Sequence, residues 1–494
     1  MAKNYMEMQL LSSRLDLFQR SLVSTRYAQF GLAQTNEGLK LAVLNLRKPG
    51  FIDQFEGEVS EYGDHTLKLC SLNRHNAENL RSNLPWLKPR VVGLQTSAGM
   101  GDRMGIATPG HVRAVRSVDG KVVPIFAQQS IREMNRTGRS PQQVMDDATW
   151  GIFEEGWQAG VGADADHLKT IEDVDACFAA GFTLFTFDPG EYVDNSSPTG
   201  DNNLLEERIK TLPVYLQPGA TGLLGRSLDI EGHKIFMSKE VLTRAALKYA
   251  KAIDHVVYLF DHLKKVAGYL PFEVEISMDE TAHPTSPAEH VYIASELKRL
   301  GINWISFAPR FVGRFENGVD YIGVLTAFEA DVAIHAAIAR QFGPYKLSLH
   351  SGSDKFSIYS IFMEATRGLA HLKTAGTSYL EALRTIAALD PYLIQEIYRF
   401  ARERFEQDRL SYHISAELNN APQPGEVKEW TDLFSQFDAR EILHVTFGSV
   451  LTEKTSDGRL RFYDRIMTLL RNNREAYFDN LESHFQRHLQ PFSM

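Results

Sequence analysis

The chain has 494 residues, of which 43% are hydrophobic and 23% charged, an ordinary composition for a globular protein. A formal net charge of −9 excludes the basic surface that nucleic-acid binding needs. The only two cysteines, Cys70 and Cys177, are too few for a disulfide framework or a zinc finger. Apolar runs fall short of the roughly 20 residues that cross a bilayer. We therefore expect a cytoplasmic protein with a small-molecule partner, no nucleic-acid or membrane partner, and an oligomeric state left open.

Residues 1–90 are predicted to form a separate small N-terminal lobe of the α/β type. Within it, Leu39–Leu46 and His65–Cys70 alternate apolar and polar residues as half-buried strands do.

From residue 91 onward, short apolar segments alternate with helix-like stretches. Serine followed by proline at Ser140-Pro141 and at Ser286-Pro287 is typical of a helix start. Eight strands are predicted, at Arg90–Gln95, Pro124–Gln129, Val161–His167, Thr183–Asp188, Phe272–Asp279, Asn303–Arg310, Tyr345–His350 and Leu369–Ala375.

This count favours a TIM-like (β/α)8 barrel over residues 91–376. The alternative is an open doubly wound sheet, for which Gly99-Met100-Gly101-Asp102-Arg103 is only a partial phosphate-binding turn. The stretch 190–271 is too long for a normal crossover and predicts an inserted helical segment. Residues 377–494 predict a helical C-terminal extension.

In such barrels the functional side chains follow the carboxyl ends of the strands. His167 and His350 each end a predicted strand and have Asp and Lys nearby, so we expect both to bind one divalent metal cation. The pattern does not distinguish Zn, Mn, Ni, Co and Fe. Glu316, Asp279 and His335 are candidates for a third ligand.

Two carboxylates are candidates for acid–base chemistry. Glu275 lies inside the strand Phe272–Asp279, where burial is expected to raise its pKa. Asp166 precedes His167, and the two would point to opposite sides of a regular strand. A bend at the strand end would let both reach the site.

Several cationic and amide side chains follow the same strand ends and suit a polyhydroxylated anion such as a sugar acid. The predicted substrate-binding residues are Arg103, Gln128, Gln129, Arg310, Asp354, Lys355 and Lys373.

At these residues the chain resembles the tagaturonate epimerase family. The matching stretches are Gly101–His111, Phe126–Ser130, Gly162–Lys169, Leu349–Phe356 and His371–Tyr379. The resemblance implies a divalent-metal-dependent isomerase that interconverts D-tagaturonate and D-fructuronate, and relatives that act on tagatose and fructose. It implies Asp166 as proton acceptor, Glu275 as proton donor, and His167 and His350 as metal ligands. A lysine is expected in the family at the position of Asn317, so preference for a uronate or for a neutral ketohexose stays open.

The carbon inverted in such an epimerisation, C4 of a ketose, is β to the ketone, and its hydrogen is not acidic in the enolate sense. Retro-aldol cleavage and re-addition is therefore favoured, with other proton-transfer routes as alternatives. An aldose–ketose isomerase or an aldolase acting on a sugar acid would share the barrel, the metal and the acid–base pair. A sugar-acid-binding protein is the non-enzymatic alternative.

Overall fold

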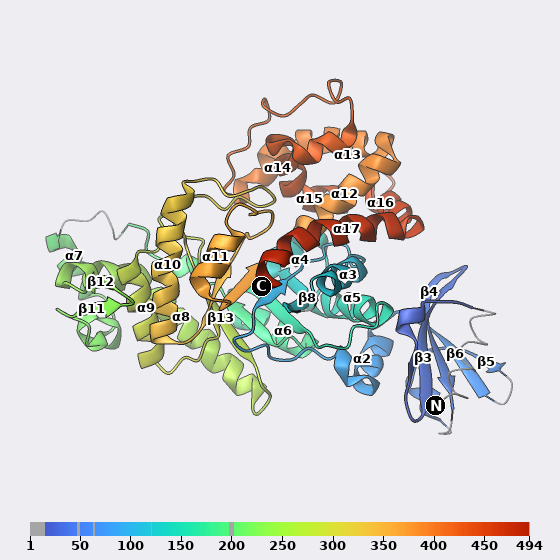
Figure 1. Ribbon diagram of the computed structural model, residues 1–494, viewed down its shortest axis with the longest axis horizontal. Helices are drawn as coiled ribbons and strands as arrows, with labels where there is room; N and C mark the ends of the chain where they lie inside the picture. The colour runs from blue at the N-terminus through green and yellow to red at the C-terminus, as the bar shows by residue number, and fades with distance from the viewer. Residues whose placement is uncertain (1–14, 47–49, 63–64, 120, 197–201, 494) are drawn as a thin grey trace.

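The computed structural model describes residues 15–46, 50–62, 65–119, 121–196 and 202–493. Its first region is an antiparallel sheet in the order β1-β3-β4-β6-β5, with β2 paired to β3. The strands are β1 (Asp16–Leu17), β2 (Val23–Ser24), β3 (Ala28–Thr35), β4 (Gly38–Asn45), β5 (Gly57–Tyr62) and β6 (His65–Ser71). Helix α2 (Arg74–Asn83) follows the sheet, which stands to one side of the molecule (Figure 1).

Eight parallel strands close into a barrel in the order β7-β8-β9-β10-β13-β14-β15-β16, as the sequence predicts. They are β7 (Ser97–Gly99), β8 (Val123–Ser130), β9 (Gly162–Leu168), β10 (Leu184–Phe187), β13 (Glu273–Met278), β14 (Ser306–Pro309), β15 (Lys346–Leu349) and β16 (Ala370–Lys373). Seven of them overlap the predicted strands.

The first predicted strand, Arg90–Gln95, is wrong. The backbone N–H groups of Val92 and Gly93 donate to the side chain of Glu273 instead of to a neighbouring strand. Gly93 has φ +64°, a left-handed conformation that ends an extended run. The segment therefore turns beneath the barrel, and strand pairing begins only at Ser97.

Helices surround the barrel, and several start as the sequence predicts. Ser140 and Ser286 cap α5 and α9 through reciprocal side-chain and backbone hydrogen bonds, with proline in the first turn. The helices are α3 (Thr108–Ser117), α4 (Ile131–Thr137), α5 (Pro141–Glu154), α6 (Ile171–Ala180), α8 (Lys239–Ala267), α9 (Pro287–Arg299), α10 (Leu325–Phe342) and α11 (Tyr359–Thr366).

The predicted insertion at 190–271 contains α7 (Asn202–Ile209) and the long α8, but also a hairpin of β11 (Ser227–Ile230) and β12 (His233–Phe236). It is therefore not purely helical. None of the helices within the described residues is long and apolar enough to cross a membrane.

Six α-helices, joined by loops and short 3-10 turns, form the described part of the C-terminal region, which packs on the barrel as a red and orange layer in Figure 1. They are α12 (Thr377–Leu389), α13 (Pro391–Asp408), α14 (Phe437–Val445), α15 (Phe447–Thr452), α16 (Tyr463–Asn472) and α17 (Arg474–Leu489). Helices α17 and α3 are in close contact: a Cβ atom on Gly110 would lie 2.7 Å from Leu481 Cβ.

Candidate active site

A cavity of about 160 Å³ opens at the carboxyl ends of the barrel strands. Apart from three histidines, four acidic and four cationic side chains line the cavity, so their formal charges cancel. The acids are Glu133, Asp166, Asp279 and Glu280; the cations are Arg103, Arg132, Arg310 and Lys373; the histidines are His167, His350 and His413. A site of this kind binds a polar ligand.

A bulge at the end of β9 brings two consecutive side chains to the cavity. Ala165 pairs with Phe185 of β10, but the next paired residue is Leu168 with Phe187, so β9 holds one extra residue. His167 within the bulge has φ +53°, a left-handed conformation that is uncommon for a residue with a side chain. The bend lets Asp166 and His167 both face the cavity, and both line it.

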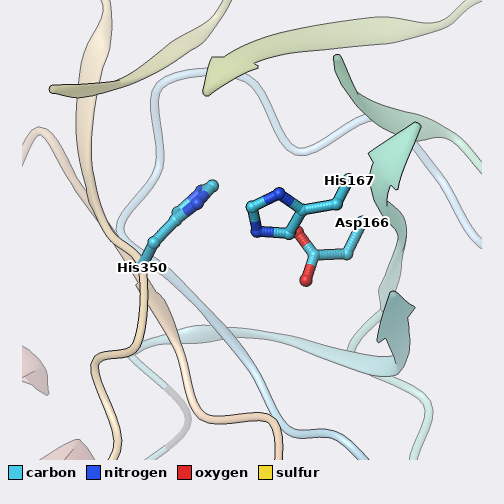
Figure 2. A group of neighbouring side chains, drawn as sticks. All are labelled: Asp166, His167 and His350. Carbon is cyan, nitrogen blue, oxygen red and sulfur yellow. The ribbon is translucent and has the colours of Figure 1, made fainter. Parts of the chain in front are cut away.

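His350 approaches from the opposite side, immediately after β15 (Figure 2). The ring centroids of His167 and His350 lie 5.1 Å apart. Asp166, His167 and His350 each offer one ligand atom, and these atoms all lie within 4.8 Å of one another. The structure thus brings together the two histidines that the sequence predicted as metal ligands, and Asp166 is the carboxylate that shares this group with them.

The nitrogen atoms of the two rings fit a metal site. His167 Nδ1 lies 3.2 Å from Asp188 Oδ2, which leaves Nε2 facing the cavity, 3.8 Å from Asp166 Oδ1. A carboxylate on the far nitrogen of a ligating histidine is a common support in metal proteins. His350 Nδ1 is buried and forms no hydrogen bond among the described residues, although Asp279 Oδ1 lies 3.1 Å away. Two imidazoles and a carboxylate suit Zn²⁺ and other first-row divalent ions.

The charges around the rings shift their protonation. Burial opposes the charged imidazole of His167, but Asp166 and Asp188 raise its pKa well above the usual value. Burial likewise opposes the charge on His350, and Asp279 together with Glu275 raises the pKa of His350 to about 9. The neighbouring carboxylates thus favour a positive charge at both histidines.

A lysine beneath the cavity joins three carboxylates. Lys373 Nζ lies 2.9 Å from Asp164 Oδ2, 2.7 Å from Asp166 Oδ1 and 2.8 Å from Glu275 Oε1. It also donates to Thr186 Oγ1 at 2.7 Å. Its donors are therefore taken by the protein, and Lys373 holds the acids in place.

The expected rise in the pKa of Glu275 is wrong. Burial alone would raise it, but the Lys373 ammonium and the His350 ring hold the pKa of Glu275 well below its usual range. Glu275 Oε1 lies 2.6 Å from His350 Nε2, and Glu275 sits behind that ring and does not line the cavity. Any proton exchange between Glu275 and a ligand would run through His350 or Lys373.

Besides Lys373, two of the predicted substrate-binding residues line the cavity, Arg103 and Arg310. Arg103 pairs with Glu133 through Nε at 2.8 Å and lies over the ring of Phe447, while its buried Nη1 has no hydrogen-bond partner among the described residues. Arg310 Nη1 makes a long contact of 3.4 Å to the Asp279 carbonyl, and its buried Nε has no hydrogen-bond partner in the part of the chain that the structure describes. Arg310 thus presents unused donors.

Gln128 and Gln129 end β8 one layer deeper. Gln128 Nε2 donates to Asp166 Oδ2 at 3.1 Å, and Gln129 Nε2 donates to Glu133 Oε2 at 3.2 Å. Neither lines the cavity, so the structure places them as supports of the acidic side chains and not as ligands of a substrate.

Asp354 and Lys355 lie away from the cavity, contrary to the substrate-binding role predicted for them. Asp354 is buried against Arg440 and His484, and Lys355 Nζ is enclosed by backbone carbonyls, including that of Glu316 at 2.6 Å. These contacts compete with any bound ligand, because they already satisfy both charges.

Two of the three candidates for an additional metal ligand also lie elsewhere. Glu316 Oε2 accepts from Ser415 N and Oγ. His335 Nδ1 lies 2.8 Å from His290 Nδ1, and its Nε2 is 3.1 Å from the Thr285 carbonyl. Asp279 alone remains beside His350. The sequence prediction named two acids and a histidine for this position and did not include Asp166, because it assigned Asp166 to proton transfer.

Sequence reasoning also missed a wall of the cavity formed by Tyr412, His413 and Ile414. These residues follow α13 and belong to no predicted strand end. No local pattern in the sequence marks them, since only the packing of the C-terminal region onto the barrel brings them here.

The fold and the site define a (β/α)8-barrel enzyme with a cluster of histidines and carboxylates at the carboxyl ends of its strands. A family model described as tagaturonate epimerase matches residues 18–492. A tagaturonate/fructuronate epimerase of Thermotoga maritima is 42% identical over 484 residues, covering 96% of each chain. The native and glycerol-bound crystal structures of fructuronate-tagaturonate epimerase from Cohnella laeviribosi match with a TM-score of 0.92 at 36% identity, covering 99–100% of this chain and 99% of theirs. The chain belongs to the tagaturonate epimerase family.

Proposed function

We propose that this protein is an isomerase that interconverts D-tagaturonate and D-fructuronate by inverting C4. The observation that carries the proposal is the convergence of Asp166, His167 and His350 in one cavity, in a chain that is 42% identical to a tagaturonate/fructuronate epimerase over nearly its whole length. The resemblance that the sequence motifs indicated points to the same activity.

Asp166 is the proposed base. It lines the cavity, and its two oxygens are oriented by Gln128 and Lys373, so it faces a substrate hydroxyl in a fixed position. Removing the proton from the C4 hydroxyl starts a retro-aldol cleavage between C3 and C4, after which the aldehyde fragment turns and the bond forms again. Returning the proton to the new C4 alkoxide completes the inversion.

Glu275 is proposed to orient the His350 ring that separates it from the cavity, and Asp166 to return its own proton, because the pKa of Glu275 is held well below its usual range and an ionised carboxylate has no proton to donate. Asp166, His167 and His350 are the residues that would hold a divalent cation. Such a cation supplies Lewis acidity toward substrate oxygens. The four acidic and four cationic side chains of the cavity lining balance one another. A bound cation would therefore give the cavity a net positive charge, which favours an anionic ligand.

Arg310 is the proposed partner of the substrate carboxylate. Its guanidinium reaches the cavity with donors that no protein carboxylate occupies within the described residues. Guanidinium binds carboxylate with two parallel hydrogen bonds, whereas Asn317, which also lines the cavity, offers only an uncharged amide.

The proposal is tested by incubating the protein with D-tagaturonate, D-fructuronate, D-tagatose or D-fructose and following each by NMR. We expect interconversion of the two uronates, and loss of turnover on chelation that Mn²⁺ or Zn²⁺ restores. Asp166→Asn should lower kcat by a factor of 10² to 10⁴, the range for removing an acid–base group. Formation of an aldose would support an isomerase, and accumulated three-carbon fragments would support an aldolase.

A further inference from the structure

Residues 412–415, called the strap below, cross the cavity from outside the barrel. They follow α13 and a short 3-10 turn (Arg409–Ser411), and they form no strand. Tyr412, His413 and Ile414 of the strap line the same cavity as Asp166 and His350. The C-terminal region therefore supplies part of the wall that a ligand meets.

Both ends of the strap are fastened to the barrel region, Tyr412 to helix α4 and Ser415 to the loop after β14. The hydroxyl of Tyr412 accepts a hydrogen bond from Arg136, and the guanidinium carbons of Arg136 and Arg132 lie 4.7 Å and 5.5 Å from its ring centroid. At the other end, Ser415 N and Oγ donate to Glu316 Oε2 at 2.7 Å and 3.0 Å. Because the Glu316 side chain is only 3% exposed, this anchor is inside the protein and not a surface contact.

His413 lies between the two anchors and is itself exposed. Within the described part of the chain its ring makes no hydrogen bond or ion pair, in contrast to the paired rings of His167 and His350. It lines the same cavity as Arg310, whose buried Nε has no partner among the described residues, and as the apolar side chains of Phe311, Phe315 and Ile414. His413 and Arg310 thus both line the cavity without a protein carboxylate as partner among the described residues.

The other cavity arginines already face acids. Arg103 pairs with Glu133, and Arg132 Nη2 lies 3.4 Å from Glu280 Oε1. An added carboxylate therefore gains most beside Arg310, since it would compete with a protein carboxylate at either of the other two.

We propose that the strap determines substrate specificity, and that His413 and Arg310 together bind the carboxylate end of the sugar acid while its reacting carbons lie at Asp166. This inference rests on the proposed function and adds to it the residues that select an acid over a neutral ketose. His413 contacts the substrate directly, and Tyr412 and Ser415 hold His413 in place.

The test compares His413→Ala and His413→Gln with His75→Ala, which replaces an exposed histidine on α2 of the N-terminal lobe. Calorimetry measures binding of D-fructuronate and of D-fructose, and steady-state assays measure KM and kcat for the uronates. We expect His413→Ala to weaken fructuronate binding and raise its KM about tenfold, as for the loss of one charge-assisted hydrogen bond, with kcat within about twofold. His413→Gln should recover part of the loss, and His75→Ala should match wild type.

D-fructose binding should not change in either His413 variant, because fructose carries no carboxylate. Unchanged fructuronate binding in His413→Ala, or an equal loss for fructuronate and fructose, overturns the assignment. Absence of uronate interconversion by the wild-type protein would instead refute the proposed function, and the calorimetric comparison would still decide whether His413 recognises the carboxylate.

Discussion

The His350 imidazole is held between two carboxylates, those of Glu275 and Asp279. Burial disfavours its charge, but the carboxylates raise its pKa to about 9, so the ring of the metal-free protein is protonated at neutral pH. A metal ion binds only the neutral imidazole. Protons and metal therefore compete for this side chain.

We expect Mn²⁺ affinity to rise at least about tenfold per pH unit between pH 7 and 8, because binding releases the His350 proton and the pKa of His167 is raised as well. Calorimetry in two buffers of different ionisation enthalpy measures the protons released. His350→Ala should bind Mn²⁺ more weakly and release one proton fewer, whereas His75→Ala should behave as wild type. An affinity that is independent of pH would contradict His350 as a ligand.

For single residues, the sequence predicted which side chains lie at strand ends but not how distant side chains change their protonation or orientation. His167 and His350 were found because each ends a strand, and position in a strand is a local property. The lowered pKa of Glu275 could not be predicted, because Lys373 and His350, which cause it, lie 98 and 75 residues away along the chain. Nor does the sequence show that Asp354 turns toward Arg440 and away from the cavity.

At the scale of elements, the loop from His350 to Lys355 forms the first part of the connection from β15 to α11 and is fixed by the C-terminal helices. Ser351 and Asp354 have φ +48° and +62°, so the loop turns sharply twice. Asp354 N donates to His488 Nε2 at 2.9 Å, its Oδ1 lies 2.6 Å from His484 Nε2, and its Oδ2 lies 2.9 Å from Arg440 Nη2. The side chain of Asp354 thus holds the loop that begins with His350.

We expect Asp354→Asn to lower the free energy of unfolding by about 3 kcal/mol, because it leaves Arg440 buried beside a neutral amide. It should also weaken Mn²⁺ binding, since the loop that carries His350 loses its anchor. Denaturant unfolding and calorimetry measure the two effects. Asp457→Asn, which breaks an exposed pair with Arg459, is the matched control and should change neither. Lower stability with unchanged Mn²⁺ affinity would show that Asp354 does not position His350.

The bulge in β9 is the second element that the site needs. Alternation in a regular strand would send Asp166 and His167 to opposite sides, and the sequence allowed a bend only as an option. The register shift against β10 supplies that bend. A bulge depends on the neighbouring strand, so strand periodicity predicted the strand and missed this detail.

At the scale of the whole molecule, buried ion pairs link the barrel to the regions before and after it. Arg81 Nη1 of the N-terminal lobe lies 2.8 Å from Asp146 Oδ1 on α5, and Arg474 Nη2 on α17 lies 2.5 Å from Glu154 Oε2 on the same helix. The sequence predicted three regions at 1–90, 91–376 and 377–494. Their mutual dependence follows only from contacts between distant residues, as does the strap at the cavity.

We therefore predict that residues 91–494 unfold as one cooperative unit, with no separate transition for the C-terminal helices. Separation would expose the apolar faces between α3 and α17 and break the pair of Arg440 with Asp354. Differential scanning calorimetry, with far-UV and near-UV circular dichroism as independent probes, measures the number of transitions. A distinct lower-temperature transition that leaves the barrel folded would contradict this prediction.

The lysine on β16 has a consequence for how the polypeptide matures. β16 is the last of the eight barrel strands in the chain and lies between β15 and β7. Until it is in place, Asp164, Asp166 and Glu275 have no ammonium group between them, and their mutual repulsion opposes closure of the cylinder. A nascent chain emerging from the ribosome would thus stay open until residue 373 is available, and the arrival of Lys373 would allow the ring of strands to close around the three carboxylates.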